Sequence, residues 1–432
     1  MRLGGRISAA IDVLTDATAQ RTPVSLALRD WGKANRYAGS KDRSAIGNYV
    51  HDALRRRSSL AFRMGDDSPR AIVLGAVVLS GGANPEDVAA SFEGDKHAPE
   101  PIAAAEMEHL KGCVPLISAP PWIQADVPEW LWPAFETNFG EEAIAEASAL
   151  TNRPPLDVRV NTLKSTVDDA LAALSELGGV KSESSPIGIR FQPREGDGRL
   201  PNVQIEKIFQ TGGVEIQDEG SQIVSLLVNA QPGEQILDYC AGGGGKSLAI
   251  AADMKNKGAV HAFDIDKRRL SPLYQRALRA GADIINVVEP PSTNLQPQFG
   301  KMDKVLIDAP CSGVGTWRRK PDAKWRLSED NMKTRYKEQR TVLAGAKNFV
   351  KPGGLLFYVT CSMLAEENEG QIYPFLEKNP EFTLLSAGEV YEERIGVNAP
   401  KPWSEDGCSL TLTPHSTNTD GFYFAVMERK ND

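Results

Sequence analysis

Five short apolar runs in the C-terminal half of the chain constrain its fold more than any other feature. Helical segments separate the runs, and Gly, Pro or acidic residues bound them. Continuous apolar runs of this length are typical of strands buried on both faces of a parallel sheet. Strands that alternate with helices form a doubly wound α/β domain, whose ligands bind beyond the carboxyl ends of the strands. We predict strands at 234–240, 258–266, 283–289, 303–310 and 353–361.

The region before these strands has a different pattern. In its first part apolar residues recur at spacings of three and four, as in Ile46 and Val50, which is typical of amphipathic helices. The Pro- and Trp-rich stretch 118–133 then indicates a boundary. An alternating pattern at 156–164 and a helical pattern at 166–178 predict a small α+β domain. The predicted domains are a helical domain at 1–125, a small α+β domain at 126–210 and an α/β domain at 211–432.

The composition limits the class of protein. The chain has 432 residues, a net charge of −8, and no apolar run near the roughly 18 residues that a membrane helix needs. Its five cysteines are odd in number and widely spaced, without a CxxC pair or a Cys/His cluster, which argues against a disulfide framework and a zinc site. We therefore expect a cytoplasmic monomer with reduced thiols, no metal and no membrane partner.

The charge is distributed unevenly along the chain. Residues 1–70 carry thirteen Lys and Arg against seven Asp and Glu, and they include "SKDRSAIGNYVHDALRRR". Such a run is either a solvated helix face or a local binding surface for a polyanion. The negative charge of the whole chain argues mildly against general nucleic-acid binding.

A glycine-rich loop follows the first predicted strand. Gly242, Gly243, Gly244 and Gly245 precede Lys246 and a helical segment. Glycines let a backbone approach a ligand closely, and a helix N-terminus favours negative charge. The loop is not a phosphate-binding P-loop, because Cys240 stands where that motif requires glycine. The alternative interpretation is a tight structural turn.

Acidic residues follow the second and third predicted strands. Asp264 ends the second strand, where an acid can bind both ribose hydroxyls of a nucleoside cofactor. Asp266 fits a helix cap better. Glu289 ends the third strand and is either a contact to the adenine side of a cofactor or an exposed loop acid.

Cysteines follow the fourth and fifth predicted strands. Cys311 lies in "DAPCSG" and Cys361 in "TCS". A lone cysteine is usually a small buried apolar residue. Two cysteines at the ligand-facing ends of neighbouring strands also fit paired catalytic thiols, because thiolates are strong nucleophiles. No histidine is adjacent to either cysteine in the sequence, so a protease-like Cys–His pair is not supported.

These motifs together resemble the Sun (Fmu) family of RNA cytosine-C5 methyltransferases. The resemblance extends over about 275 residues, and "GSKDRSAIGNYVHDALRRR" at 39–57 is similar to the NusB-like RNA-binding domain of bacterial ribosomal RNA members. It implies a Rossmann-like methyltransferase domain after an all-α NusB-like domain and a small RRM-like α+β domain. The matching segments are "VRVNTLK" (158–164), "QDEGSQ" (217–222), "DYCAGGGGK" (238–246), "DAPCSG" (308–313), "TCS" with its trailing "EEN" (360–368) and "DGFYFAVMER" (420–429).

The resemblance implies S-adenosylmethionine as the methyl donor. Asp264 matches the ribose-binding acid, and Glu289 stands where the family usually has an Asp near the adenine. The family usually reads Cys-Ala-Ala-Pro-Gly-Gly-Lys in the loop, and Gly242 and Gly243 replace the second Ala and the Pro here. The residues that would cradle the methionine part are Cys240, Ala241, Gly242, Gly243, Gly244, Gly245 and Lys246.

The resemblance also implies roles for three reacting groups. Cys361 matches the nucleophile that adds to C6 of cytosine, and Cys311 matches a second cysteine that assists product release. Asp308 matches the acid between cofactor and base. A target base must leave its stack, or lie in a single-stranded loop, to be reached.

Basic residues after the fourth strand are candidates for contact with RNA. They are Arg318, Arg319, Lys320 and Lys324 in "TWRRKPDAKW". They either hold the RNA backbone or form an ordinary solvated loop.

The leading prediction is a methyltransferase that forms 5-methylcytosine in small-subunit ribosomal RNA. The same reaction on transfer RNA is an alternative, because the catalytic motifs do not separate the two substrates. A non-catalytic RNA-binding factor is another alternative, against which the presence of Cys361, Cys311, Asp308 and Asp264 together argues. A DNA cytosine methyltransferase would use the Pro-Cys cysteine, Cys311, as its nucleophile.

Overall fold

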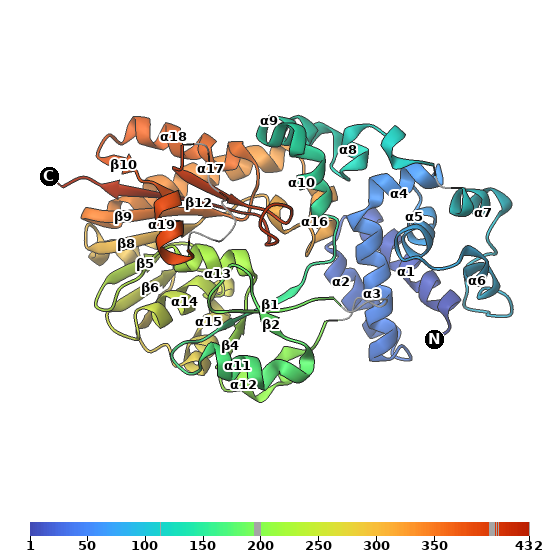
Figure 1. Cartoon of the computed structure of the whole chain (residues 1–432), viewed down its shortest axis with the longest axis horizontal. Helices are drawn as coiled ribbons and strands as arrows, with labels where there is room; N and C mark the ends of the chain where they lie inside the picture. The colour runs from blue at the N-terminus through green and yellow to red at the C-terminus, as the bar shows by residue number, and fades with distance from the viewer. Residues whose placement is uncertain (113, 194–199, 397–401, 403, 405, 432) are drawn as a thin grey trace. The chain divides into compact units, whose positions relative to one another are not determined.

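The chain folds into two compact units (Figure 1). The first consists mainly of Met1–Pro154 together with the returning segment Trp317–Leu327, and the second contains both sheets. The helical N-terminal region, the small sheet and the α/β domain confirm the predicted fold class. The exact domain boundaries stay a prediction. The computed structural model describes residues 1–112, 114–193, 200–396, 402, 404 and 406–431.

Amphipathic helices build the first unit. Ile7 and Val13 of α1 and Ile46 and Val50 of α3 are almost fully buried and share one apolar core. Burial of such a stripe stabilises a helix more than its intrinsic propensity does. The helices described in this part are α1 (Leu3–Ala19), α2 (Val24–Ala34), α3 (Ser40–Arg55), α4 (Arg57–Met64), α5 (Pro69–Gly75), the π-helix η1 (Ala76–Ser80), α6 (Pro85–Ala90), α7 (Ala104–Lys111), α8 (Pro121–Gln124), α9 (Trp132–Phe139), α10 (Ala143–Ala149) and α16 (Pro321–Arg326).

The helix α16 joins this unit although it comes from a distant part of the sequence. The preceding Trp317 is almost fully buried and lies against Phe135, with ring centroids 6.2 Å apart. Trp325 donates its indole N–H to the carbonyl oxygen of Leu54 at 2.7 Å. Aromatic packing and a hydrogen bond therefore fix the segment in the helical unit.

A four-stranded antiparallel sheet opens the second unit, in the order β2-β3-β1-β4. Val158 and Val160 of β1 point to a core that also holds Leu174 of α11. The strand and the helix predicted at 156–164 and 166–178 are thus present, with shorter bounds. The elements are β1 (Leu156–Val160), α11 (Val167–Leu174), β2 (Val180–Lys181), β3 (Gly188–Phe191), α12 (Lys207–Gln210) and β4 (Val214–Ile216).

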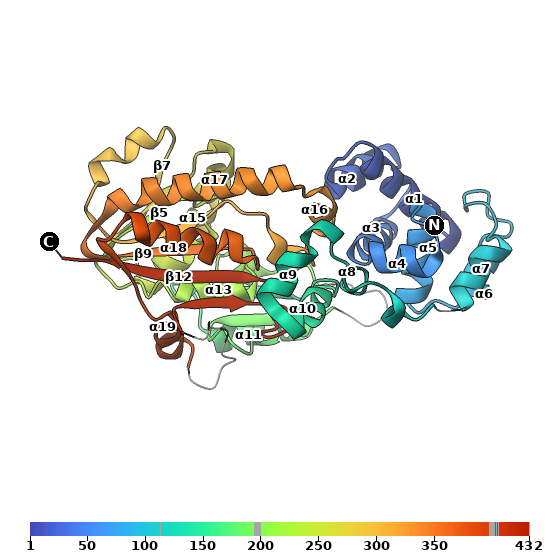
Figure 2. The same cartoon turned by 90° about the horizontal axis from the view of Figure 1, so that it is seen from above.

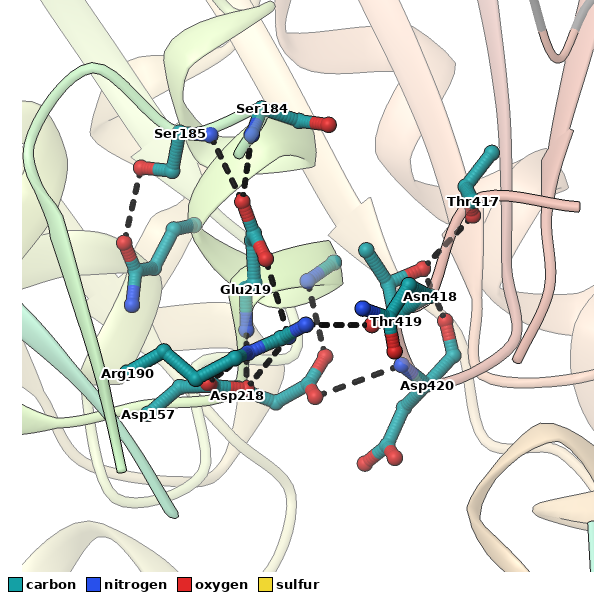
Figure 3. A network of polar contacts seen from close by, with 12 residues as sticks. Asp157, Ser184, Ser185, Arg190, Asp218, Glu219, Thr417, Asn418, Thr419 and Asp420 are labelled. Atoms are coloured by element: carbon teal, nitrogen blue, oxygen red, sulfur yellow. Dashed lines mark hydrogen bonds and ion pairs between the residues drawn. The ribbon is translucent and has the colours of Figure 1, made fainter. Parts of the chain in front are cut away.

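A buried polar network ties this small sheet to the rest of the second unit (Figure 3). Arg190 on β3 forms ion pairs with Asp157 at 2.6 Å and with Glu219 at 2.8 Å. Glu219 also accepts two backbone N–H groups at 2.8 Å. Arg190 donates to the carbonyl oxygen of Asn418, just before the last strand. Because each buried charge has several partners, the network holds the two sheets in one unit.

The large sheet has the order β10-β12-β9-β8-β5-β6-β7, and β11 pairs with β12. Neighbouring strands from β5 to β9 are parallel, which confirms the five predicted strands. The strands β10, β11 and β12 add an antiparallel edge. Strand bounds are β5 (Gln235–Asp238), β6 (Ala259–Phe263), β7 (Ile285–Val288), β8 (Met302–Asp308), β9 (Val350–Thr360), β10 (Phe382–Leu384), β11 (Ser409–Leu412) and β12 (Phe422–Arg429).

Helices cover both faces of the large sheet (Figure 2). Leu306 of β8 joins the core under α13, α14 and α19, whereas its neighbours Val305 and Ile307 join the core under α17 and α18. This alternation explains the continuous apolar run in the sequence. The helices are α13 (Glu219–Leu226), α14 (Gly245–Asp253), α15 (Lys267–Ala280), α17 (Glu329–Ala346), α18 (Glu369–Lys378) and α19 (Ala387–Arg394).

The parallel strands place their carboxyl ends along one edge of the sheet. Asp238, Asp308 and Thr360 are the last residues of β5, β8 and β9. A ligand site is expected along this edge. Among the described residues, no helix is both long and apolar enough to cross a bilayer.

Candidate active site

The two predicted cysteines lie side by side. Asp308 of β8 is in register with Val359 of β9, so the loops that follow these strands leave the sheet together. Cys311 Sγ lies 3.3 Å from Cys361 Sγ, and both side chains are partly exposed. The hydrogen bond with Cys361, together with burial, raises the pKa of the Cys311 thiol well above its usual value. Cys311 therefore keeps its proton at neutral pH.

A buried carboxylate holds the Cys311 loop. Glu367 accepts the backbone N–H of Ser312 at 2.8 Å and also its hydroxyl. Gln339 of α17 donates to Glu367 at 3.0 Å and to the carbonyl oxygen of Pro310 at 3.0 Å. Because Glu367 accepts hydrogen bonds from both Ser312 groups and from Gln339, it restricts where the Cys311 loop can move.

Asn368, the residue after Glu367, holds the Cys361 loop. Thr360 donates its hydroxyl to Asn368 at 2.6 Å, and Asn368 donates to the carbonyl oxygen of Ser362 at 3.2 Å. The sequence alone did not predict these roles for Glu367, Asn368 and Gln339. "EEN" is part of the family resemblance, which gives these residues no role.

An ion pair borders the cysteines. Lys246 Nζ lies 2.6 Å from Asp308 Oδ2, and Lys246 is almost buried whereas Asp308 is one-third exposed. Burial disfavours the ammonium, but the Asp308 carboxylate outweighs it and raises the pKa of Lys246. The ammonium also lies 5.3 Å from the centre of the Phe422 ring. Asp308 is therefore the member of the pair that a ligand can reach.

The glycine loop connects β5 to α14 by a tight path. Gly242 and Gly244 have φ angles of +50° and +78°, which favour glycine. A Cβ atom at Gly244 would lie 2.1 Å from Leu273 Cδ1, so no larger residue fits there. Burial raises the pKa of the Cys240 thiol well above its usual value, which makes Cys240 a poor nucleophile.

Asp264 anchors this loop from the end of β6. It is almost fully buried, accepts the N–H of Gly242 at 3.0 Å and the N–H of Asp266 at 2.9 Å, and pairs with Arg269 at 3.1 Å. A carboxylate has about four lone-pair positions, so Asp264 keeps capacity for a further donor. Asp266 accepts the N–H of Arg268 and caps α15, as predicted.

Glu289 follows β7 on the same edge of the sheet. It pairs with Lys267 at 2.6 Å and accepts the hydroxyl of Tyr274 at 3.2 Å. The hydrogen bond with Lys267 lowers the pKa of Glu289. Glu289 is thus an exposed, ionised acid beside an aromatic ring.

The edge residues fit a nucleoside cofactor with a charged amino-acid part. Buried Asp238 has one carboxylate oxygen without a hydrogen-bond partner, and burial raises its pKa to about 7. The Ser247 hydroxyl donates to its other oxygen at 2.6 Å. An acid therefore stands at or just after the end of each of four neighbouring parallel strands, β8, β5, β6 and β7, and the glycine loop follows β5. These carboxylate acceptors suit the hydroxyls of a ribose and the ammonium of an amino-acid group.

The predicted RNA loop is divided between buried and exposed residues. Arg318 and Lys324 are buried in the first unit. Lys324 donates to the carbonyl oxygen of Arg55 at 3.0 Å, and its Nζ lies 4.8 Å from the centre of the Trp325 ring. This burial argues against the predicted contact of Arg318 and Lys324 with the RNA backbone, because phosphate cannot reach them.

The other two basic residues of that loop lie differently. Lys320 is exposed and Arg319 is partly exposed. Their contact with RNA stays a prediction. Burial lowers the pKa of Lys324 to about 8, whereas a phosphate contact would raise the pKa of a lysine.

Two family models match the chain. The model described as "16S rRNA methyltransferase RsmB/F" matches residues 225–428. The model described as "Methyltr_RsmF/B-like, ferredoxin-like domain" matches residues 127–193. The matched ranges contain the large sheet and most of the small sheet.

Curated relatives agree with these models. The chain is 32% identical over 314 residues to the probable ribosomal RNA small subunit methyltransferase B of Bacillus subtilis (strain 168), a match that covers 70% of this chain and 66% of the relative. The corresponding protein of Synechocystis sp. is also 32% identical over 314 residues, with 71% and 67% covered. The chain thus spans about two thirds of the length of these relatives.

Solved structures show the same fold. The crystal structure of PH0851 has a TM-score of 0.74 and 25% identity, and 99% of each chain is covered. NSun6 from Pyrococcus horikoshii with SFG has a TM-score of 0.61 at 22% identity, with 71% of this chain and 99% of that chain covered. The second likeness supports the fold alone.

Proposed function

The chain belongs to the RsmB/F family of 16S rRNA methyltransferases, and on that premise we propose that it methylates C5 of a cytosine in small-subunit ribosomal RNA. S-adenosylmethionine is the methyl donor. The observation that carries the proposal is the pair of thiols 3.3 Å apart beside the Lys246–Asp308 ion pair. One nucleophile, one protonated thiol and one acid at a single edge are what this chemistry needs. The reaction takes place in the cytoplasm on a monomeric enzyme.

Cys361 is the attacking group. C5 of cytosine is a weak nucleophile, and addition of the Cys361 sulfur to C6 makes C5 enamine-like. The cytosine must leave its stack to reach the sulfur. The hydrogen bonds of Thr360 and Asn368 hold the Cys361 loop, so little reorganisation is needed at the moment of attack.

Asp308 stabilises the charge that develops on the base. In its protonated form it donates a hydrogen bond to N3 of the cytosine. Before the base binds, Asp308 is the carboxylate partner of the Lys246 ammonium, whose pKa it raises. The proton that reaches N3 therefore comes from this pair, at the place where negative charge accumulates.

The glycine loop and the strand-end acids orient the methyl donor. When bound, S-adenosylmethionine supplies the methyl group that C5 takes. Backbone groups from Cys240 to Lys246 would hold its methionine part, Asp264 would bind the ribose hydroxyls, and Glu289 would contact the adenine side.

Cys311 assists the release of the product. Water takes up the C5 proton, the C5–C6 double bond forms again, and the C6–S bond to Cys361 breaks. The Cys311 thiol, 3.3 Å away and protonated at neutral pH, gives its proton to the leaving Cys361 sulfur, which a serine hydroxyl is too weak an acid to do. Without this donor, we expect the covalent adduct to persist.

Single cysteine variants test the assignment. We expect Cys361→Ser to lose methyl transfer from labelled S-adenosylmethionine to ribosomal RNA, and Cys311→Ser to accumulate a covalent protein–RNA adduct that survives denaturing electrophoresis. Cys408→Ser is the matched control, because Cys408 lies away from the strand-end site and hydrogen-bonds with Asp406. An adduct in Cys361→Ser instead would reverse the two roles. If wild type methylates no RNA, the proposed function is wrong.

A further inference from the structure

Two arginines hold carbonyl oxygens of the glycine loop. Arg276 of α15 donates to the carbonyl oxygen of Gly243 at 2.5 Å, and Arg159 of β1 donates to that of Gly245 at 2.7 Å. Glycine loses more conformational freedom on ordering than any other residue, so a run of four glycines is unfavourable to order. The proposed reaction gives neither arginine a role.

A buried acid of the small sheet fixes Arg276. Glu215 of β4 is almost fully buried and lies 3.2 Å from Arg276 Nη2. The same carboxylate pairs with Arg279, one turn further along α15. The side chains of Arg276 and Arg279 are 25% and 24% exposed, so the two differ little in burial. They differ in direction, because Arg276 reaches the loop whereas the Arg279 guanidinium lies 4.2 Å from the centre of the Phe209 ring.

Arg159 connects the small sheet to the loop at a second place. It is almost fully buried and also donates to Gln217, the residue directly after β4. Burial lowers the pKa of Arg159 to about 10, so its guanidinium stays charged at neutral pH. Its contact with Gly245 is therefore a charge-assisted hydrogen bond, which is stronger than one between neutral groups.

Fixed carbonyl groups also orient the peptide planes to which they belong. A peptide unit is planar, so the direction of a carbonyl sets that of the next N–H. The N–H after Gly243 belongs to Gly244, which closes the loop on the carbonyl oxygen of Ala241 at 2.8 Å. The N–H after Gly245 belongs to Lys246, in the first turn of α14. The two arginines therefore hold the loop in one shape without help from a ligand.

We propose that Arg276, held by Glu215 of the small sheet, is a positioning residue for the cofactor, and that Arg159 supports it. The inference rests on the proposed function, because the loop is the proposed cradle for the methionine part of S-adenosylmethionine. It adds that the small sheet pre-organises this cradle. A loop that is already ordered loses less conformational entropy when the cofactor binds, so the affinity is higher. The alternative is that Arg276 only joins α15 to the small sheet, as Arg279 does.

Isothermal titration calorimetry of the full-length protein with S-adenosylhomocysteine tests this role. We expect Arg276→Ala to bind about tenfold more weakly, because a hydrogen bond from a charged donor to the loop is lost. Arg279→Ala is the matched control, since Arg279 is equally exposed and pairs with the same Glu215 carboxylate. We expect its affinity to stay within twofold of wild type. Equal affinities of the two variants would overturn the proposal.

A second substitution separates positioning of the loop from packing of α15. Gly243 has no positive φ angle, and a Cβ atom there would have Arg276 Nη1 as its nearest neighbour, at 3.2 Å. The matching position of the family is usually proline, so a Cβ atom is compatible with the cradle. We expect Gly243→Ala to recover about threefold in affinity when added to Arg276→Ala, because alanine has less freedom to lose than glycine. A double variant that binds no better than Arg276→Ala would contradict the positioning role.

Adduct formation by the Cys311→Ser variant separates this inference from the proposed function. If no adduct forms but Arg276→Ala still weakens binding of S-adenosylhomocysteine, the positioning role stands and the cysteine chemistry is wrong. If the adduct forms and Arg276→Ala binds as wild type, the positioning role alone is wrong. If wild type does not bind S-adenosylhomocysteine, the cofactor site is wrong and the inference fails with it.

Discussion

Two buried lysines of this protein have pKa values that are shifted in opposite directions. Lys246, at the edge of the large sheet, has a carboxylate 2.6 Å away, and its pKa is raised. Lys324, in the helical unit, has a carbonyl oxygen and two tryptophan rings near its ammonium. Burial lowers its pKa to about 8, and buried Asp126 offsets this only in part. Dipoles and ring faces compensate a buried charge less than a full counter-charge does. Similar burial therefore leaves the ammonium stabilised in one place and destabilised in the other.

The largest effect is expected from Lys246→Met. The change removes the positive charge behind Asp308 at the place where the base becomes negative, and we expect kcat/KM for methyl transfer to fall about 100-fold. RNA binding by anisotropy should stay within twofold of wild type. Activity within threefold of wild type would show that Lys246 is only structural, like Lys324.

A smaller loss is expected from Glu367→Gln. The buried carboxylate accepts hydrogen bonds from Ser312 and Gln339, and an amide supplies one fewer acceptor atom at nearly the same volume. We expect kcat to fall about tenfold with an unchanged KM, because the Cys311 loop loosens while the RNA contacts stay. Glu369→Gln is the comparison variant, since Glu369 lies on α18 and hydrogen-bonds with Ser409 instead. A tenfold loss there as well would point to a general packing effect.

Lys324→Met is expected to change stability rather than activity. Folding moves the pKa of Lys324 from 10.5 to about 8, so the unfolded chain binds more protons between these values. The free energy of unfolding of wild type should therefore rise as pH increases from 8 to 10.5, by at most about 3 kcal/mol from this group. In Lys324→Met that contribution disappears, and urea unfolding at pH 8 and pH 10 measures the difference. An identical pH dependence in the two proteins contradicts the assignment.

The smallest effect is expected from Lys320→Gln. Lys320 is exposed and directly precedes α16, the helix that contains Lys324, so we expect a two- to threefold weaker affinity for RNA and an unchanged free energy of unfolding. The pair Lys320→Gln and Lys324→Met thus separates surface charge from buried charge within one short segment. An unchanged affinity in Lys320→Gln would remove Lys320 from the RNA contacts.

The central parallel strands were predictable because they are buried on both faces and read as continuous apolar runs, whereas the edge strand β7 is only partly buried. The run Val305–Leu306–Ile307 shows this, since its residues alternate between two cores. The antiparallel edge formed by β10 and β11 was not predictable in the same way, because β10 is short and its pattern is weak. Likewise, no local pattern distinguishes the buried Lys324 from the exposed Lys320.

The sequence by itself determined the α/β fold and the strand ends that carry Cys311, Cys361, Asp308 and Asp264, because the hydrophobic period and the alternation of strands with helices along the chain are local properties. Only the tertiary structure decided that the two thiols meet at 3.3 Å and that Glu367 lies behind them. Only the tertiary structure showed that Lys246 pairs with Asp308 and that Lys324 lies against tryptophan rings. The physical reason is that burial and pairing of a charge depend on neighbours distant in the chain, and a sequence pattern does not contain those distances.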